Sequence, residues 1–383
     1  MKNKQTILHL SLIDGIGPIT IKKLVQKKQK DFLLSDFYNL TISDIMHQFG
    51  VSQKVAQKIF SGLQDTSILQ RELALIEKHE ISWTAFGFDG YPHLLLEIYA
   101  PPAILYFKGN FLSEDKKTIA VIGSRKAHRY AEQIIGQFVP QLVQQGWTIV
   151  SGGALGADSM AHSQTVQAGG RTVVVLGSGL LRLYPASNAK LFDSILQAGG
   201  ALVSSFPLLT EAMPGNFPAR NRIIAGLSRG CLVVQAAQKS GARITAQFAL
   251  EQGREVFAVP GPIDDELSLG CHGLIQQGAK LTGCVEDILV EFADGLEKNN
   301  TGPAIVQQKV AHVQKTIIPQ KRVQKPELEG IEQKVWLACA QATSADDLTH
   351  KIGLEPHQLH TLLFELQLAG HIKQNFAGLW ERR

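Results

Sequence analysis

Residues 118–158 read TIAVIGSRKAHRYAEQIIGQFVPQLVQQGWTIVSGGALGAD, in which two short apolar runs flank a helical pattern. The runs at 118–122 and 148–150 are continuous and rich in β-branched residues, as is typical of strands buried on both faces. Residues 130–145, between them, have the pattern of an amphipathic helix. A loop containing glycine follows each strand. This order predicts a parallel βαβ unit.

The same alternation of strands and helices continues after residue 158. The further strands expected are 172–176, 201–203, 231–234 and 256–259, and the further helices are 158–168 and 188–197. Repeated alternation of this kind predicts an α/β domain, an extended Rossmann-like fold with a doubly wound parallel sheet. We place this domain at residues 66–292.

A small helical domain is expected at residues 1–65, where apolar residues recur at helical spacing. The turn Gly15-Ile16-Gly17-Pro18 separates two of the expected helices. Turns of this kind occur in helix-hairpin-helix elements, whose backbone amides hold a DNA phosphate. The alternative is a packed bundle in which the turn is a connector, and the sequence leaves both open.

The C-terminal part predicts a linker followed by a winged helix. Residues 293–328 lose the periodic pattern, contain scattered lysines and glutamines, and predict a flexible basic linker. Residues 329–383 predict three helices and two short strands, the order of a winged helix. The third expected helix, 355–369, contains no lysine or arginine, which argues against a reader of duplex sequence.

The composition is that of a globular protein with several domains. The 383 residues are 44% hydrophobic and 19% charged, which argues against disorder, and the net charge of +4 permits a local site for a polyanion. Four cysteines without CxxC spacing favour reduced thiols in the cytoplasm over a zinc or redox site. We expect no signal peptide and no membrane span.

The loops expected after the strands carry small, polar and basic residues. Ligands of an open parallel sheet bind at the carboxyl ends of its strands. Glycine lets backbone amides approach an anion, and arginine and lysine neutralise it. Together the loops predict a phosphate site, although each glycine loop alone is also what a Rossmann-like turn requires. The candidates are Gly123, Ser124, Arg125, Lys126, Ser151, Gly152, Gly153, Ser178, Gly179, Asn188 and, in a later loop over 214–222, Phe217, Arg220, Asn221 and Arg222, together with Ser240 and Gly241.

Familiar enzyme signatures are absent from these loops. Gly177-Ser178-Gly179 begins a dinucleotide fingerprint, but Arg182 stands where the third glycine belongs. The sequence has no GK[ST] phosphate loop and no PGGxGT segment of the lysine-decarboxylase-like group. Asp158 and His162 have the spacing to share a metal or a proton, but no third ligand lies nearby, which favours a local hydrogen bond. We therefore expect no cofactor, no metal and no catalytic residues.

Several ordered motifs resemble those of one family, the DprA/Smf DNA-processing proteins. The matching segments are VIGSR at 121–125, SGGALGAD at 151–158, FPARNRIIAG at 217–226 and the SGxxxTA pattern that begins at Ser240 and Gly241. The resemblance runs over nearly the whole chain. It departs at Ala127-His128, where members often carry serine, at Gln235, where glutamate is common, and at Arg243.

The resemblance implies a homodimeric protein, not an enzyme, that binds single-stranded DNA, protects it during natural transformation and loads RecA onto it. It implies a phosphate contact for Arg125, amide contacts at Gly152-Gly153 and Ser178-Gly179, and base stacking on Phe217. Arg220, Asn221 and Arg222 join this site; the alternative is that Asn221 and one arginine brace the loop. An enzyme that acts on a nucleotide phosphate in the same pocket stays open as the second function.

Overall fold

The chain divides into two units in the computed structural model, Met1–Asn299 and Asn300–Arg383. The structure describes residues 3–28, 32–111, 117–295, 330–340, 343, 345–354, 356–369, 371–374 and 380–382. No helix in these ranges has the length and apolar character needed to cross a membrane.

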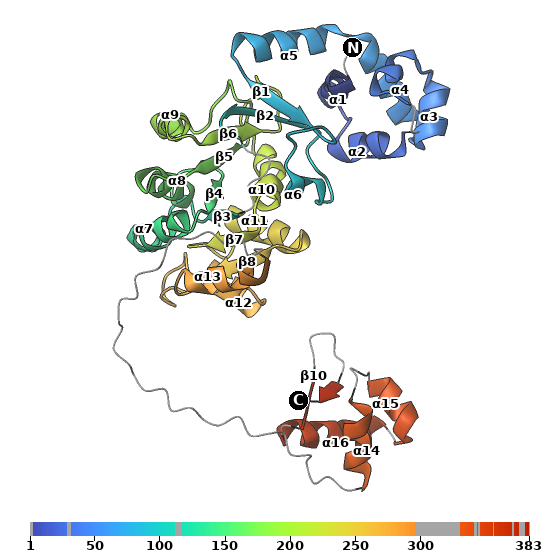
Figure 1. The fold of residues 1–383 in the computed structure, drawn as a ribbon, viewed down its shortest axis with the longest axis vertical. Helices are drawn as coiled ribbons and strands as arrows, with labels where there is room; N and C mark the ends of the chain where they lie inside the picture. Colours follow the sequence, from blue (N-terminus) through green and yellow to red (C-terminus); the bar gives the residue numbers. More distant parts are fainter. Residues whose placement is uncertain are drawn as a thin grey trace, which may run out of the picture. The chain divides into compact units, whose positions relative to one another are not determined.

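Nine strands of the first unit's described residues form one sheet, in the order β1-β2-β6-β5-β4-β3-β7-β8-β9 (Figure 1). The strands are β1 Ser82–Ala85, β2 Ile104–Gly109, β3 Thr118–Ile122, β4 Thr148–Ser151, β5 Thr172–Leu176, β6 Ala201–Ser204, β7 Gly230–Val233, β8 Glu255–Ala258 and β9 Lys280–Leu281. From β6 to β9 all pairs are parallel, whereas β2 pairs antiparallel with β1 and β6. The predicted doubly wound sheet is confirmed, with its switch point between β3 and β7.

Helices cover both faces of this sheet (Figure 1). On one face lie α7 Arg129–Gln144, α8 Ala157–Gln167, α9 Ala189–Gln197 and α13 Glu286–Leu289. On the other lie α6 His93–Leu96, α10 Asn216–Gly226, α11 Gly241–Glu251 and α12 Leu269–Gln276. Ile119 and Val121 of β3 pack on the first face and Ala120 and Ile122 on the second. Because both faces are covered, the strand has no exposed polar side.

One segment expected as a loop, residues 214–222, instead begins helix α10. Gly215 and Pro218 made it look like a loop. Pro218 lies in the first turn of the helix, where the amide hydrogen that proline lacks would have no intrahelical partner. Ile223 and Ala225 are buried against the sheet and favour the helix. Successive residues of α10 therefore point about 100° apart around its axis.

The N-terminal residues form helices that pack onto the same sheet. Within the described range these are α1 Asn3–Leu12, α2 Pro18–Lys27, α3 Ile42–Phe49, α4 Gln53–Gln64 and α5 Ser67–Lys78, with a short 3-10 helix at Leu34–Asn39. Their apolar side chains share one core cluster with Tyr106 of β2, Val174 of β5 and Leu202 of β6. The predicted boundary at residue 65 falls between α4 and α5.

The second unit has the predicted order of a winged helix. It contains α14 Gly330–Ala338, α15 Ala345–Ile352, α16 Pro356–Leu368 and the antiparallel strands β10 Ile372–Gln374 and β11 Trp380–Arg382. Val335, Leu348, Leu363 and Trp380 are buried in its core. Of the predicted linker at 293–328, residues 296–328 lie outside the described ranges.

Candidate nucleic-acid interface

The loops after β3, β4, β5 and β7 meet at the carboxyl edge of the sheet, around the switch point. The backbone amide of Ser124 donates to the Gln235 carbonyl at 2.7 Å and joins the β3 loop to the β7 loop. The Ser124 carbonyl accepts from the Ala157 amide at 3.1 Å, which joins the same loop to the start of α8. The structure thus brings most of the predicted site residues to one edge.

Four of the side chains at this edge form a buried layer, namely Asp158, Asn188, Arg220 and Asn221. Arg220 is 4% exposed; its Nη1 donates to the carbonyls of Gly152 and Val175, and its Nε donates to Asn221 Oδ1 at 3.1 Å. Asn188 Nδ2 donates to the Gly153 carbonyl at 2.9 Å. These side chains hold the loops after β4 and β5 against α10.

Asp158 and Arg220 bring opposite charges into this layer. Asp158 Oδ2 accepts the amides of Gly152 at 3.1 Å and Ala154 at 3.3 Å. Burial raises the pKa of Asp158, and the Arg220 charge and the two amides oppose that rise. Burial lowers the pKa of Arg220 to about 10, and the Asp158 charge opposes that fall. Arg220 therefore stays protonated at neutral pH and compensates the buried carboxylate.

An exposed layer lies over the same edge and consists of Arg125, Lys126, Tyr184 and Phe217. Arg125 and Lys126 are exposed, and the Arg125 guanidinium carbon lies 4.9 Å from the centre of the Phe217 ring. The Tyr184 ring, which is 48% exposed, lies 5.8 Å from the Phe217 ring. This layer offers free positive charge beside two aromatic rings, the combination that suits phosphates and unstacked bases.

Two of the backbone amides predicted to hold phosphate are already hydrogen-bonded within the protein. The Gly152 amide donates to Asp158, and the Gly179 amide donates to the Thr210 carbonyl at 2.8 Å. Gly153 and Ser178 are buried, and the Ser178 hydroxyl has no partner among the described residues. The amides of Gly152 and Gly179 are therefore not available to a phosphate.

The remaining predicted residues lie where α10 meets α11. Gly241 is exposed at the start of α11, and its carbonyl accepts from Asn221 Nδ2 at 3.4 Å. The neighbouring Ser240 hydroxyl lacks a hydrogen-bond partner within the described ranges. Arg222 is partly buried, and its Nε donates to the Ala219 carbonyl at 3.1 Å. Arg222 and Arg220 thus point in different directions from one helix.

A second polar group at this edge was not singled out from the sequence. His128 Nε2 lies 3.0 Å from Asp265 Oδ2, and Gln235 Nε2 donates to the same oxygen at 3.1 Å. The His128 amide donates to Gln235 Oε1 at 3.2 Å. His128 and Gln235 are two of the positions that depart from the DprA/Smf pattern. The two departures are therefore in contact with each other in the folded protein.

Metal-binding geometry is not found in the described residues, which contain no group of three or more histidine, cysteine, aspartate or glutamate side chains suited to an ion. Asp158 and His162 have separate partners. Asp158 accepts backbone amides, whereas His162 Nδ1 lies 2.7 Å from Thr172 Oγ1.

The sequence of the sheet unit matches a known family. Residues 83–293 match the model of DNA recombination-mediator protein A, and residues 319–375 match the DprA winged helix domain. The chain belongs to the DprA/Smf family. Protein Smf of Escherichia coli (strain K12) is 37% identical over 333 residues, which are 86% of this chain and 84% of that protein. DNA processing protein DprA of Bacillus subtilis (strain 168) is 42% identical over 228 residues, covering 59% of this chain and 76% of that protein.

Solved DprA structures share the fold. The X-ray structure of DprA from Streptococcus pneumoniae aligns with a TM-score of 0.66 at 34% identity and covers 76% of this chain and 99% of that one. DprA from Helicobacter pylori, in a structure described as giving insight into its single-stranded DNA binding mode, aligns with a TM-score of 0.51 at 26% identity. That alignment covers 56% of this chain and 97% of the Helicobacter chain. Both layers of the sheet edge lie inside the segment that matches the DprA family model.

Proposed function

We propose that this chain is a non-catalytic, cytoplasmic protein that binds single-stranded DNA across the carboxyl edge of its sheet. The exposed layer carries this proposal. Arg125 and Lys126 are exposed and form no ion pair with a carboxylate among the described residues, and Phe217 and Tyr184 supply rings on which bases can stack. The relationship to the Helicobacter protein, for which single-stranded DNA binding is described, supports the same assignment.

The two layers have different roles in this proposal. Arg125, Lys126 and Phe217 contact the strand, and the predicted contacts of Gly123, Ser124, Gly153, Ser178, Ser240, Gly241 and Arg222 are retained as candidates. The buried Ser151 hydroxyl donates to the Val121 carbonyl at 2.6 Å, so Ser151 holds the ends of β3 and β4 together instead. Arg220, Asn221 and Asn188 hold the loops in place, since their polar groups are already bonded to the protein. Gly152 and Gly179 shape the loops. Contacts made by charge and stacking do not discriminate bases, so binding is tolerant of sequence.

A comparison of single-stranded and duplex DNA tests this function. In a gel-shift titration over a salt series, we expect the single strand to bind more tightly than the duplex of the same sequence, because stacking requires unpaired bases. Equal affinity for the two forms at every salt concentration would contradict the proposal.

We propose further that the protein is a homodimer through its sheet unit and delivers the strand to RecA in natural transformation. Membership of a recombination-mediator family supports this, because a mediator must present its DNA to a recombinase. Two strand sites on one dimer would raise avidity for long strands. Light scattering at micromolar concentration tests the dimer, and co-purification of RecA with the DNA-bound protein tests the partner. A monomer, or DNA-bound protein that leaves RecA behind, would contradict the corresponding part.

One observation favours a second function, hydrolysis of a nucleotide phosphate. His128 is paired with Asp265, and its side chain is 49% exposed at the edge where phosphates would lie. A carboxylate that orients an imidazole is the arrangement of a general base, and a substrate would have to replace the Tyr130 amide that His128 Nδ1 accepts at 3.4 Å. Incubation with free nucleotides decides between the two functions. Phosphate release by the wild type that is lost in His128→Ala supports hydrolysis, and no release supports the binding protein.

A further inference from the structure

The N-terminal helices contain two glycine turns that face each other's lysines. Gly15 follows α1 with φ +79°, and Gly50 ends α3 with φ +61°; both lie in the left-handed region that favours glycine. Lys58 of α4 donates to the Asp14 carbonyl at 3.1 Å and occupies the space that a Cβ on Gly15 would need. Lys23 of α2 donates to the Gly50 carbonyl. Each hairpin therefore places ammonium groups on the turn of the other.

Lys27 also lies near Gly50, and Lys54 lies one turn from Lys58 on α4. We call these four residues the lysine surface: Lys23, Lys27, Lys54 and Lys58. Lys23 and Lys27 are four residues apart on α2, as Lys54 and Lys58 are on α4, so each pair lies on one face of its helix. None of the four forms an ion pair with a carboxylate in the described ranges. Their charges remain available to an anion.

The balance of charge singles out the same region. Residues 1–65 contain nine lysines, five aspartates, no arginine and no glutamate. This excess of four equals the net charge of +4 for the whole chain, so the other residues are balanced. A local excess of this kind attracts a polyanion even when the protein as a whole is only mildly basic.

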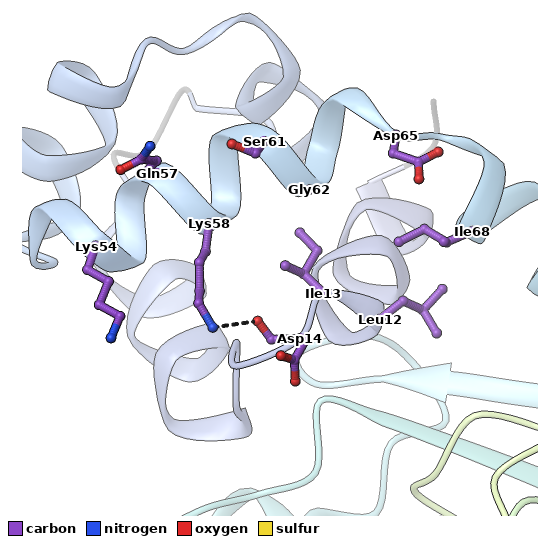
Figure 2. Close-up of a pocket in the computed structure, with 10 residues that line it drawn as sticks. All are labelled: Leu12, Ile13, Asp14, Lys54, Gln57, Lys58, Ser61, Gly62, Asp65 and Ile68. Atoms are coloured by element: carbon purple, nitrogen blue, oxygen red, sulfur yellow. Dashed lines mark hydrogen bonds between the residues drawn. The ribbon is translucent and has the colours of Figure 1, made fainter.

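A groove of about 600 Å³ runs between the end of α1 and α4, and Lys54 and Lys58 extend over it from α4 (Figure 2). Ile13 and Gly62 line the groove, and the carboxylates of Asp14 and Asp65 also border it. Asp65 accepts the amide and the hydroxyl of Ser67, the first residue of α5, at 3.0 and 2.6 Å. Lys54 and Lys58 lie at one end of the groove with the Asp14 carboxylate beside Lys58, and Asp65 lies at the other end (Figure 2).

The groove continues toward the sheet edge. A neighbouring hollow of about 380 Å³ shares Leu12, Ile13 and Asp14 with it and is also lined by Pro207 of the loop after β6. The carbonyl of Pro207 lies against Gly179, where a Cβ would collide with it. Pro207 therefore lies next to both this hollow and the buried Gly179 of the loop after β5.

We propose that the lysine surface is a second phosphate-binding surface, which takes the backbone of a single strand that continues from the sheet edge. This inference rests on the function proposed above. The residues that line the groove include no aromatic ring, so the contact is with phosphates and not with bases. The position of Pro207, between this hollow and the loop after β5, favours the same single strand over a separate duplex.

Strand length and paired charge reversals test the lysine surface in the full chain. The variants are Lys54→Glu with Lys58→Glu and, separately, Lys23→Glu with Lys27→Glu. The matched control is Lys78→Glu with Lys108→Glu, which makes the same charge change at two exposed lysines elsewhere. Affinity is measured for strands of about 6 and about 20 nucleotides, short and long relative to known single-strand sites.

We expect both lysine-surface variants to lose at least about tenfold in affinity for the long strand, with the short strand unaffected and the control like wild type. Neutral variants, Lys54→Gln with Lys58→Gln, are expected to lose less. The salt slope for the long strand should become shallower by about 1.4, since about 0.7 is lost for each phosphate released. Circular dichroism confirms that each variant is folded.

The outcomes separate this inference from the proposed function. Wild type that binds neither strand refutes the proposed function and this inference with it. Wild type that binds both strands, with folded charge reversals that match the control on the long strand, overturns the lysine surface and leaves the sheet-edge site intact. Loss of duplex binding with unchanged single-strand binding also overturns it.

Discussion

The buried and exposed layers of the sheet edge differ in what their arginines touch. Arg220 and Arg125 both lie near Phe217, with guanidinium carbons 5.9 and 4.9 Å from the ring centre. Arg220 is buried and bonded to two carbonyls and to Asn221, whereas Arg125 is exposed. One cluster of motifs therefore contains residues that hold the edge together and residues that are free to meet a ligand. Substitutions at the two arginines should fail in different ways.

Arg220→Ala should have the largest effect, and the effect should be on folding. It leaves Asp158 buried without its compensating charge and removes the Nη1 group that donates to the Gly152 and Val175 carbonyls. Loss of one partner of a buried pair costs about 3–5 kcal/mol in the free energy of unfolding. Urea denaturation measures it, with Arg125→Ala as the control, expected within about 0.5 kcal/mol of wild type. Equal stability of the two variants would remove the distinction between the layers.

Arg125→Glu should have the largest effect on DNA binding and little on folding. It replaces a free positive charge with a negative one at the position where phosphates are proposed to lie. We expect affinity for a single strand to fall at least about 100-fold, as for other reversals at charged interfaces. Fluorescence anisotropy with a labelled strand measures this, and Lys78→Glu controls for the change in net charge. A folded Arg125→Glu protein that binds like wild type would place the DNA elsewhere.

The sequence predicted the framework of this edge better than the division into layers. The strands from 118 onward were predictable because both faces are covered and the apolar runs are continuous. The antiparallel pair β1–β2 was missed, since Pro101 and Pro102 precede β2 and Gly109 ends it. Helix α10 was missed because Pro218 resembles a loop signal. Whether Arg220 and Arg222 are buried depends on the direction in which each side chain leaves helix α10. Their positions in the sequence motif do not show this direction.

Phe217→Ala should weaken DNA binding without changing its salt dependence. If a base stacks on this ring, the loss is about 1–3 kcal/mol in binding free energy. Stacking releases no counterions, so the slope of log affinity against log salt should stay the same. Titrations at several salt concentrations measure both quantities, and Phe217→Tyr is the control that keeps a stacking face. A shallower slope in Phe217→Ala would mean that the substitution displaces Arg125.

His162→Gln should change how strongly acid destabilises the folded protein. His162, like the residues of the buried layer, is enclosed by the protein. Burial, together with the Arg220 charge, lowers the pKa of His162 to about 3. Histidine in an unfolded chain has a pKa of about 6.5. Below that pH, His162 is protonated in the unfolded chain but not in the folded protein. The stabilisation is complete above pH 6.5 and declines as the pH falls, by roughly 2 kcal/mol at pH 5.

The readout for His162 is the difference in pH dependence between two proteins. Urea denaturation of wild type and His162→Gln is carried out at several pH values between 7 and 5. The carboxylates titrate in both proteins, so the difference between the two curves reports His162 alone. The variant should lose less stability on acidification, even if its stability at pH 7 is lower. Parallel curves would show that the pKa of His162 is the same in the folded protein as in the unfolded chain.

Lys126→Ala should have the smallest effect, and it tests whether the exposed layer works through phosphates. With about four phosphates neutralised at the sheet edge, log affinity should fall with log salt at a slope of about −3. Removal of one contact should make the slope shallower by about 0.7 and change affinity little at high salt, where counterion release contributes least. Asn188→Ala, a change in the buried layer, is the control and should leave the slope unchanged while lowering stability. The opposite result would be a wild-type slope in Lys126→Ala and a changed slope in Asn188→Ala. It would mean that the phosphates contact the buried layer, and that the exposed layer does not bind the strand as proposed.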